Sequence, residues 1–495
     1  MIGRTSQTVT LRSYSIGADT GPTWLLTELW ESLGFGALLR QALRRGRRHF
    51  DAEAVVRLMV FNRLCDPSSK LGVLRWLEGV VVPGVETGRL THQHLLRAMD
   101  ALMRHREPIR KALCRCLLPL IDRELSVVFY DLTPLRVHGE GEVEGELRAW
   151  GRSKELEGHP ARQVVLGLVQ TADGLPLDFE VFEGNVAEVS TLVPVLERCR
   201  SSYAIDRMVV VADRGLLSLD NVEQIERLGL EYILAVPAGR YRDFAGLLGQ
   251  LVFEPEGESV RETQWQGRRL VVAHSPEQAR LQGERRQEKL DELIAFGEKL
   301  AGKLDAQEAG QSERGRRASD RGAYSRFCRA VHEAHFSRFI TPELESERFS
   351  FTVHEQAIER ASWLDGKLVL LSNVGALPKE EIVSRYKALA DIERGFRVLK
   401  RDLEIAPMYH YKPERIRAHV LLCFLALVLH RVMRMRLKAH DSPFSVERAL
   451  EKLRGIQLHQ VEIGHKRWRG LTKMTPEQLK LFETLEVKAP SAEAM

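Results

Sequence analysis

The segment YKALADIERGFRVLK, at residues 386–400, is the stretch from which the fold of this chain can be worked outward. Its periodicity predicts one helix, because apolar residues recur at the three- and four-residue intervals of an α-helix. These apolar residues form a stripe that needs a core to cover it: Ile392, Phe396, Leu399 and Leu403. Tyr386, Glu393 and Lys400 are spaced seven apart and share a second face, which drifts by only about 20° per step. That face either presents a metal ligand beside a phosphate backbone or is an ordinary solvated side.

Length and composition are those of a soluble globular protein. The 495 residues suffice for two to four domains and at least one large core. The apolar and charged fractions, 44% and 28%, are not those of a disordered chain. The formal net charge of +5 does not by itself indicate a polyanionic partner. The charge is uneven, however, because residues 394–438 carry eleven basic and three acidic side chains, a net +8.

Cysteine usage and hydropathy favour a reducing, cytoplasmic setting without a membrane. Six cysteines are scattered, and the close pair Cys114 and Cys116 has no second pair, so we expect neither a zinc cage nor a disulfide framework. The N-terminus lacks the hydrophobic core of a signal peptide. The longest apolar run, residues 420–429, is too short to span a bilayer and predicts a buried helix.

The middle of the chain predicts a mixed sheet. Hydrophobic runs typical of strands occur at residues 127–130, 163–170, 175–182, 208–212 and 232–236. Asp173-Gly174 is a hairpin signal between the second and third runs, and helical patterns at 188–200 and 221–228 separate the later ones. The order β-β-β-α-β-α-β predicts three antiparallel strands that feed alternating α/β units, giving a five-stranded mixed sheet flanked by helices.

Composition divides the chain into five expected regions. They are a helical N-terminal DNA-binding or accessory region at 1–120, a first core part at 121–240, an α+β insertion at 241–365, a second core part at 366–440 and a helical tail at 441–495. Basic residues between 40 and 49 could meet DNA phosphates, although a surface charge run explains them as well.

Two aspartates and a glutamate are candidate metal ligands. Asp131 and Asp213 each follow a β-branched run, where a polar side chain is presented at the edge of a sheet on a rigid backbone. With Glu393 they would give three carboxylates, which can hold two Mg²⁺ ions roughly 3.5–4 Å apart. One ion then activates the attacking oxygen and the other stabilises the leaving oxygen of a phosphoryl displacement. Alternatively, each aspartate merely caps the turn after its strand.

At these residues the sequence resembles the Asp-Asp-Glu transposases of bacterial insertion sequences, which have an RNase H-like catalytic fold. The resemblance rests on YDLT around Asp131, VVVADRGLLS around Asp213 and the Glu393 helix. Spacings of 82 and then 180 residues suit the branch whose sheet is interrupted by an insertion domain before the glutamate.

That branch carries a Tyr-x2-Arg-x3-Glu-x6-Lys signature. Tyr386, Glu393 and Lys400 match it, but Leu389 occupies the arginine position. Arg385 or Arg397 is expected to take over the phosphate contact. Further similar features are Gly184-Asn185, the PSSK stretch at residues 67–70, and Tyr409-His410 followed by a long helix with His419.

The resemblance implies a metal-dependent DNA transposase. Asp131, Asp213 and Glu393 would ligate two Mg²⁺, with Mn²⁺ as a substitute. Water would attack the phosphodiester at the transposon end, and the released 3′-OH would attack target DNA or the other strand. The residues expected to contact DNA near the cut are Tyr386, Arg394, Arg397 and Lys400.

The resemblance also implies the partners. They are double-stranded DNA, as terminal inverted repeats and as target, and a second copy of the chain in a nucleoid-associated synaptic complex. Trp265 and Trp363 are candidates to stack a flipped base in the insertion, or else are packed core residues.

Two other functions fit part of the sequence. A nuclease of the same fold acting on RNA–DNA hybrids would use the same triad but leaves the insertion and the basic helices unexplained. A catalytically silent, transposase-derived DNA-binding protein would explain the basic segment, but it would not need Asp131, Asp213 and Glu393 to be intact.

Overall fold

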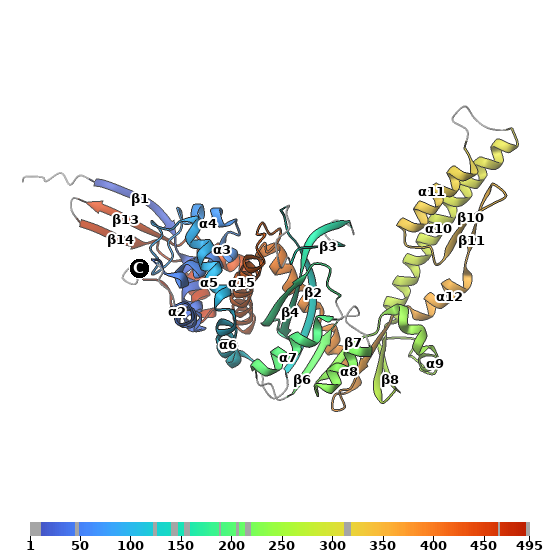
Figure 1. Cartoon of the computed structure of the whole chain (residues 1–495), viewed down its shortest axis with the longest axis horizontal. Coiled ribbons are helices and arrows are strands. Elements are labelled where there is room, and N and C mark those ends of the chain that lie inside the picture. The colour runs from blue at the N-terminus through green and yellow to red at the C-terminus, as the bar shows by residue number, and fades with distance from the viewer. Residues whose placement is uncertain are drawn as a thin grey trace, which may run out of the picture. The chain divides into compact units, whose positions relative to one another are not determined.

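The computed structural model divides the chain into two compact units. It describes residues 11–44, 49–121, 126–139, 147–152, 159–187, 190–203, 207–212, 219–310, 318–463 and 466–491. The first unit comprises Met1–Leu234 and Ser384–Met495, and the second is Ala235–Val383 (Figure 1). The second unit overlaps the insertion expected at residues 241–365.

The first unit is built on a mixed sheet with β2 (Ser126–Arg136) at its centre. β2 pairs antiparallel with β4 (Pro160–Thr171), and β4 pairs antiparallel with β5 (Pro176–Glu183). Gly174, in the turn between β4 and β5, has a positive φ of 79°, which glycine adopts without strain. The short β3 (Ala149–Arg152) continues along the same edge of β4 beyond β5. The predicted antiparallel strands and their hairpin are therefore confirmed.

Two parallel strands extend the sheet on the other side of β2. They are β6 (Met208–Ala212), which pairs with β2, and β7 (Glu231–Ala235), which pairs with β6. All five residues of β6 are buried, as expected of a parallel strand covered on both faces. The helices of this α/β part are α7 (Leu192–Tyr203) and α8 (Leu219–Arg227). The described strands of this sheet in the first unit are β3, β5, β4, β2, β6 and β7, so the predicted mixed character is confirmed, whereas the predicted number of five strands is not.

The central helix of the first unit is α15 (Pro413–Ala439), which contacts β5 and the N-terminal helices α3 (Ala52–Cys65) and α5 (His92–Arg104). Its apolar run at residues 420–429 is buried throughout, so the predicted buried helix is confirmed. Among the described residues, this is the one helix long and apolar enough to cross a membrane by length and composition, and 94% of its most apolar window is buried in the protein.

Both ends of the chain contain strands where the sequence predicted only helices. The helices are α1 (Gly21–Ser32), α2 (Phe35–Leu43), α4 (Lys70–Trp76), α6 (Arg106–Leu117), η1 (Leu118–Leu120), α16 (Val446–Leu453) and α17 (Pro476–Thr484). A three-stranded sheet joins β1 (Leu11–Asp19) to β13 (Gln457–Ile463) and β14 (Lys466–Leu471). The all-helical prediction is wrong here because these short polar strands find their partner at the opposite end of the chain, which local periodicity does not show.

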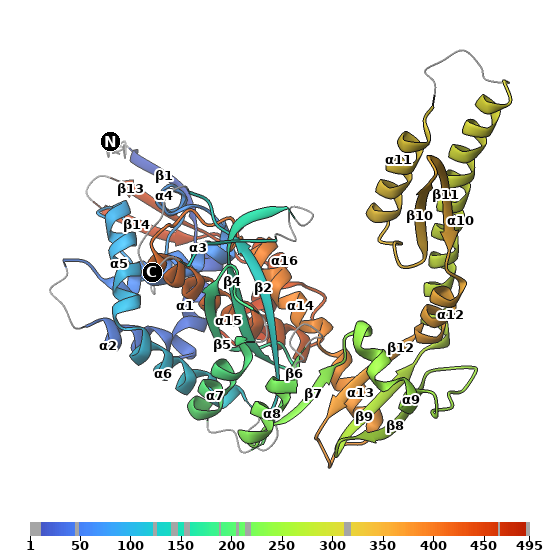
Figure 2. The same cartoon turned by 45° about the vertical axis from the view of Figure 1, so that its right-hand side comes forward.

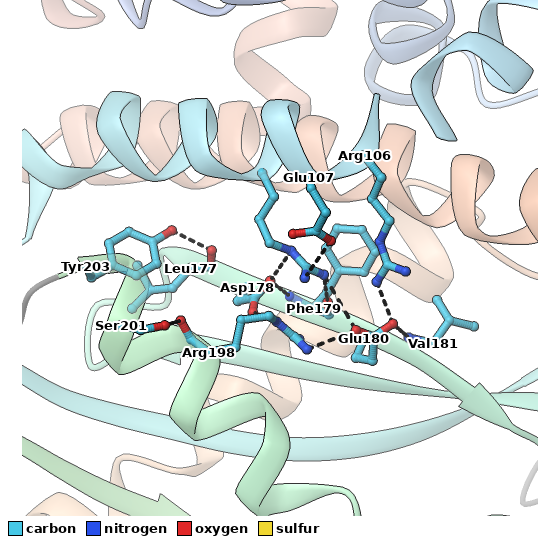
Figure 3. A network of polar contacts seen from close by, with 11 residues as sticks. Arg106, Glu107, Leu177, Asp178, Phe179, Glu180, Val181, Arg198, Ser201 and Tyr203 are labelled. Atoms are coloured by element: carbon cyan, nitrogen blue, oxygen red, sulfur yellow. Dashed lines mark hydrogen bonds and ion pairs between the residues drawn. The ribbon is translucent and has the colours of Figure 1, made fainter. Parts of the chain in front are cut away.

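A network of partly buried ion pairs fastens α6 to the sheet and to α7 (Figure 3). Arg106 contacts Glu180 on β5 at 2.6 Å, and Arg198 on α7 contacts both Glu180 at 3.1 Å and Asp178 at 2.8 Å. Arg110 on α6 reaches the same two carboxylates, at 3.5 Å and 3.4 Å. Burial tends to raise the pKa of Glu180, but Arg106 and Arg198 outweigh it and hold that pKa below its usual value.

The second unit has a hydrophobic core of its own. Its elements are η5 (Ala238–Phe244), α9 (Ala245–Leu248), β8 (Ser259–Trp265), β9 (Arg268–His274), α10 (Pro276–Glu308), α11 (Asp320–Glu333), β10 (Ile340–Glu345), β11 (Arg348–Val353), α12 (Glu355–Leu364) and β12 (Lys367–Ser372). β8, β9 and β12 form an antiparallel sheet. α10 and α11 pack beside the β10–β11 hairpin (Figure 2) around the buried ring of Phe327. Ser275 caps α10 by accepting a hydrogen bond from the N–H of Gln278 at 3.3 Å.

Candidate functional site

Asp131 lies within β2, directly after the last described pair between this strand and β6. Within the described residues, the parallel pairing of β2 with β6 runs to Tyr130 and Ala212, and the pairing of β2 with β4 runs to Arg136. Asp131 is half-buried, and its Oδ1 accepts a hydrogen bond of 2.7 Å from the N–H of Leu132. Asp213, the residue after Ala212 in the sequence, lies outside the described residues. The backbone of Asp131 is paired with that of Leu168 on β4.

The prediction that this strand stops at Asp131 is wrong. β2 continues to Arg136 and includes Pro134, which lies opposite Val165 of β4. Proline has no N–H to donate, yet the register with β4 continues through Pro134 to Arg136. β2 pairs regularly with β4 both before and after Asp131 in the sequence, and this pairing fixes the backbone of Asp131.

The helix expected to carry the glutamate crosses the face of the sheet that Asp131 occupies. Residues two apart on a strand, and residues opposite each other on paired strands, share a face. Asp131 therefore shares a face with Phe129, and Phe129 is opposite Gln170 of β4. A Cβ built on Gly395 of α14 (Ala390–Arg397) would lie 2.7 Å from Oε1 of Gln170. α14 also contacts β2 directly.

The single helix predicted for residues 386–400 is interrupted twice. Tyr386 is near the end of α13 (Lys379–Lys387), and a turn at residues 388–389 precedes α14. Lys400 lies in η6 (Val398–Asp402), a π-helical turn in which the N–H of Leu403 bonds the carbonyl of Val398 at 2.9 Å. The seven-residue alignment of Tyr386, Glu393 and Lys400 on one straight helix is therefore wrong.

The predicted apolar stripe of residues 386–403 is buried where its side chains are described. Phe396, Leu399 and Leu403 are buried, so these members of the predicted apolar stripe are confirmed. Glu393 belongs to α14, but its side chain lies outside the described ones. Leu389, at the position of the expected arginine, is half-buried in the turn before α14.

A buried polar cluster lies between α14 and the sheet. Gln170 and Arg431 of α15 are 0% and 1% exposed. The Arg431 guanidinium fits between two glycines: a Cβ on Gly174 would lie 3.3 Å from its Cζ, and a Cβ on Gly395 would lie 3.2 Å from its Nη2. Within the described residues, neither amide atom of Gln170 has a hydrogen-bond partner. Arg431 follows the apolar run at residues 420–429 and precedes Val432 and Met433, and this apolar setting was the sequence signal for a buried role.

Two of the predicted DNA contacts meet further cations in a cleft, here called the α14 cleft. Arg394 and Arg397 line it together with Arg434 and Lys438 of α15, and its volume is about 440 Å³. Arg397, one of the two candidates to replace the arginine missing at residue 389, is exposed there. The cleft combines positive charge from two helices, as phosphate binding requires.

The basic cluster near the N-terminus is only partly available. Arg40 is held by Glu31 at 2.9 Å and contacts Glu53 at 3.4 Å. Residues 45–48 lie outside the described residues.

One group of described side chains has the spacing of a metal site, and it is not the predicted triad. Ligand atoms of Asp402, His430 and Glu447 lie within 4.8 Å of one another. His430 Nε2 bonds Glu447 Oε1 at 2.9 Å, which lowers the pKa of Glu447 to about 2. Burial and the charge of Glu447 raise the pKa of Asp402. A mixed nitrogen and oxygen set suits a transition-metal ion better than Mg²⁺, and the arginines of the adjacent α14 cleft oppose any cation.

The two tryptophans proposed to stack a flipped base differ in exposure. Trp265 is half-buried and packs edge-on against Phe244, with ring centroids 5.0 Å apart. Trp363 is 39% exposed, and Lys367 Nζ lies 4.9 Å from its ring centroid. Trp363 is thus the more accessible of the two.

Comparison with known proteins identifies the family. No curated protein matches the chain. Among solved structures, the cryo-EM structure of a piggyBac transposase synaptic complex with hairpin DNA is similar, with a TM-score of 0.42 and 7% identity over 90% of this chain and 82% of that one. The model of the transposase DDE domain matches residues 122–429, a span that holds Asp131, Asp213 and Glu393. This span is more than half of the 495 residues, and the chain therefore belongs to the DDE-domain transposases.

Proposed function

We propose that this transposase cuts and joins DNA by cut-and-paste transposition of a bacterial insertion sequence, using two Mg²⁺ ions held by Asp131, Asp213 and Glu393 in an RNase H-like core. The observation that carries the proposal is the position of α14 over the face of the sheet that holds Asp131. The strand order β5-β4-β2-β6-β7 supports the RNase H-like assignment.

Chain connectivity supports the pairing of the two aspartates. Tyr130 lies opposite Ala212 in adjacent parallel strands, which are about 4.8 Å apart. The Cα atom of the next residue is about 3.8 Å from that of Ala212. Asp213 follows Ala212 directly in the sequence, and the proposal therefore assigns it to the same metal pair as Asp131.

Helix geometry supports the third ligand. Glu393 precedes Gly395 by two residues, which is about 3 Å along a helix axis. Because Gly395 contacts Gln170 on the Asp131 face, Glu393 is expected near that face as well. Three carboxylates offer the hard oxygen ligands that Mg²⁺ and Mn²⁺ prefer.

The side chains of this chain would divide the reaction between them. Bound Mg²⁺ would supply electrostatic activation of the attacking and leaving oxygens. Asp131 is oriented for ligation by the hydrogen bond from Leu132. Arg394 and Arg397 would hold DNA phosphates in the α14 cleft, with Tyr386 and Lys400 as further DNA contacts. Water would cut the transposon end, and the released 3′-OH would attack target DNA within a homodimeric, nucleoid-associated complex.

Cleavage of a duplex that carries the terminal inverted repeats of the element tests this proposal. Asp131→Asn and Glu393→Gln should abolish Mg²⁺-dependent cleavage, whereas Asp402→Asn, which alters the His-containing cluster, should retain it. Loss of cleavage with Asp402→Asn but not with Glu393→Gln would move the metal site to that cluster and overturn the proposal. Preferential cleavage of RNA–DNA hybrids would favour the nuclease of the same fold. Binding of the ends without cleavage would favour the catalytically silent DNA-binding protein.

A further inference from the structure

Two sequence motifs far apart in the chain meet in one cleft of the first unit, here called the Lys70 cleft. The PSSK stretch at residues 67–70 joins α3 to α4, and Tyr409 and His410 precede α15. Both line a cleft of about 560 Å³. The proposed cleavage chemistry uses neither motif.

Lys70 is a mostly buried residue whose ammonium group has no counter-ion among the described residues. It is 7% exposed and lines the cleft, and within the described part of the chain its side chain has no hydrogen bond or ion pair. Burial and the neighbouring Arg63 lower the pKa of Lys70 to about 7. An isolated buried charge is costly unless an anion pairs with it.

The other groups around Lys70 also favour an anion. Burial, Lys70 and Arg415 lower the pKa of His410 to about 4. The His419 imidazole is buried, with Nε2 3.1 Å from the carbonyl oxygen of Ile405. The titratable groups facing the cleft come from α3, α5, the segment before α15 and α15 itself: Arg63, His92, Glu404, Tyr409, His410, Tyr411, Arg415 and His419. Glu404 is the single acidic group in that set.

The mouth of the cleft has a surface suited to a nucleotide. Tyr409 is 71% exposed, and its ring stacks on His138 with centroids 5.1 Å apart and an angle of 13° between the planes. The exposed part of the Tyr409 ring is therefore available to a sugar beside a phosphate in the cleft. This combination favours a phosphodiester over a small free anion.

The Lys70 cleft is tied to the strand that carries Asp131. The N–H of His138 bonds the carbonyl of Met408 at 2.7 Å, and the N–H of Met408 bonds the carbonyl of Arg136 at 3.1 Å. From Asp131 to Val137 is six residues, or about 20 Å at roughly 3.3 Å per residue. Along duplex DNA, about 20 Å corresponds to roughly six base pairs.

We propose that the Lys70 cleft binds one backbone phosphodiester of the transposon-end duplex, about six base pairs from the cut, with Lys70 as its counter-ion. This inference rests on the proposed cleavage at Asp131. It assigns a DNA-positioning site to the junction of α3, α4 and α15, separate from the α14 cleft.

Neutral linkages locate such a contact in the unaltered protein. Single methylphosphonates are placed at successive positions of the end duplex, and the Kd of each duplex is measured. We expect the natural protein to bind more weakly to the duplex whose methylphosphonate lies about six base pairs from the cut. The Kd of Lys70→Met should be the same for that duplex as for the unmodified one. In Lys70→Met, the slope of log K against log salt concentration should fall by about one. Lys452→Met, which alters an exposed lysine paired with Glu477, is the matched control.

The outcomes separate this inference from the proposed function. If the natural protein binds and cuts its ends but no linkage is sensitive to Lys70, the phosphodiester site is refuted and the catalytic proposal stands. If the natural protein neither binds nor cuts the ends, both the proposed function and the phosphodiester site are refuted. Inorganic phosphate binding that Lys70→Met abolishes, with unchanged DNA affinity, would show a free-phosphate site and overturn the inference.

Discussion

The placement of α14 can be tested by adding one methyl group. In Gly395→Ala, the new Cβ would lie 2.7 Å and 2.8 Å from the amide atoms of Gln170 and 3.2 Å from Nη2 of Arg431. Neither neighbour can move into solvent, because both are fully buried. Restoring an ordinary contact of 3.4 Å requires a displacement of about 0.7 Å. Because both side chains are enclosed by protein, we expect α14 to take up part of this displacement and Glu393 to move with it.

The expected loss follows from that displacement. A shift approaching 1 Å in a catalytic group costs on the order of 10²-fold in rate. Overpacking should also reduce the free energy of unfolding by about 1–3 kcal/mol. Cleavage of the end duplex at saturating DNA measures the first effect, and urea unfolding measures the second.

Two further variants make this test specific. Gly302→Ala, in α10, places its Cβ in open space and should leave cleavage unchanged. The double variant Gly395→Ala/Gln170→Ala removes the closest clash and should recover part of the rate that Gly395→Ala loses. Cleavage by Gly395→Ala within about twofold of the natural protein would refute the inferred packing of α14 over the Asp131 face.

Three other predictions concern charge. Lys70→Met should raise the free energy of unfolding more at pH 6 than at pH 9, and by at most about 5 kcal/mol, when urea unfolding is followed at both pH values. The reason is that the lysine pKa falls from 10.5 to about 7 on folding, so that the unfavourable buried charge is fully present only below about pH 7. Glu180→Gln should destabilise the fold by about 1.5–3 kcal/mol at pH 7, because Arg106 loses its carboxylate partner while Asp178 still pairs with Arg110 and Arg198. pH-dependent unfolding should show this difference shrinking as pH falls through the depressed pKa of Glu180. Arg397→Ala should weaken binding of the end duplex and lower the slope of log K against log salt concentration by about one, when Kd is measured at several salt concentrations. Arg227→Ala, at an exposed position on α8, should change neither quantity.

Local signals were sufficient to predict the sheet. The β-branched runs at residues 127–130 and 208–212 form β2 and β6, and Asp173-Gly174 forms the expected hairpin. Such runs are informative because a strand buried on both faces has little freedom in composition. The same runs indicated where Asp131 lies, although not that β2 continues past it.

Features that depend on tertiary contacts could not be predicted. No glycine or proline marks the turn at residues 388–389, and the π-helical turn of η6 alters the helical phase that the seven-residue spacing assumed. β1 pairs with β13 at the other end of the chain. Arg431 and Lys70 look like other basic residues in the sequence, and only the packing of distant segments buries them.

Asp131, Asp213 and Glu393 are proposed to hold the metal ions together. Anomalous diffraction from crystals of the complex of this protein with its end duplex, soaked in Mn²⁺, tests this directly. We expect two peaks about 3.5–4 Å apart, both ligated by these three carboxylates. A single peak at Asp402, His430 and Glu447, with none at Asp131, would contradict it.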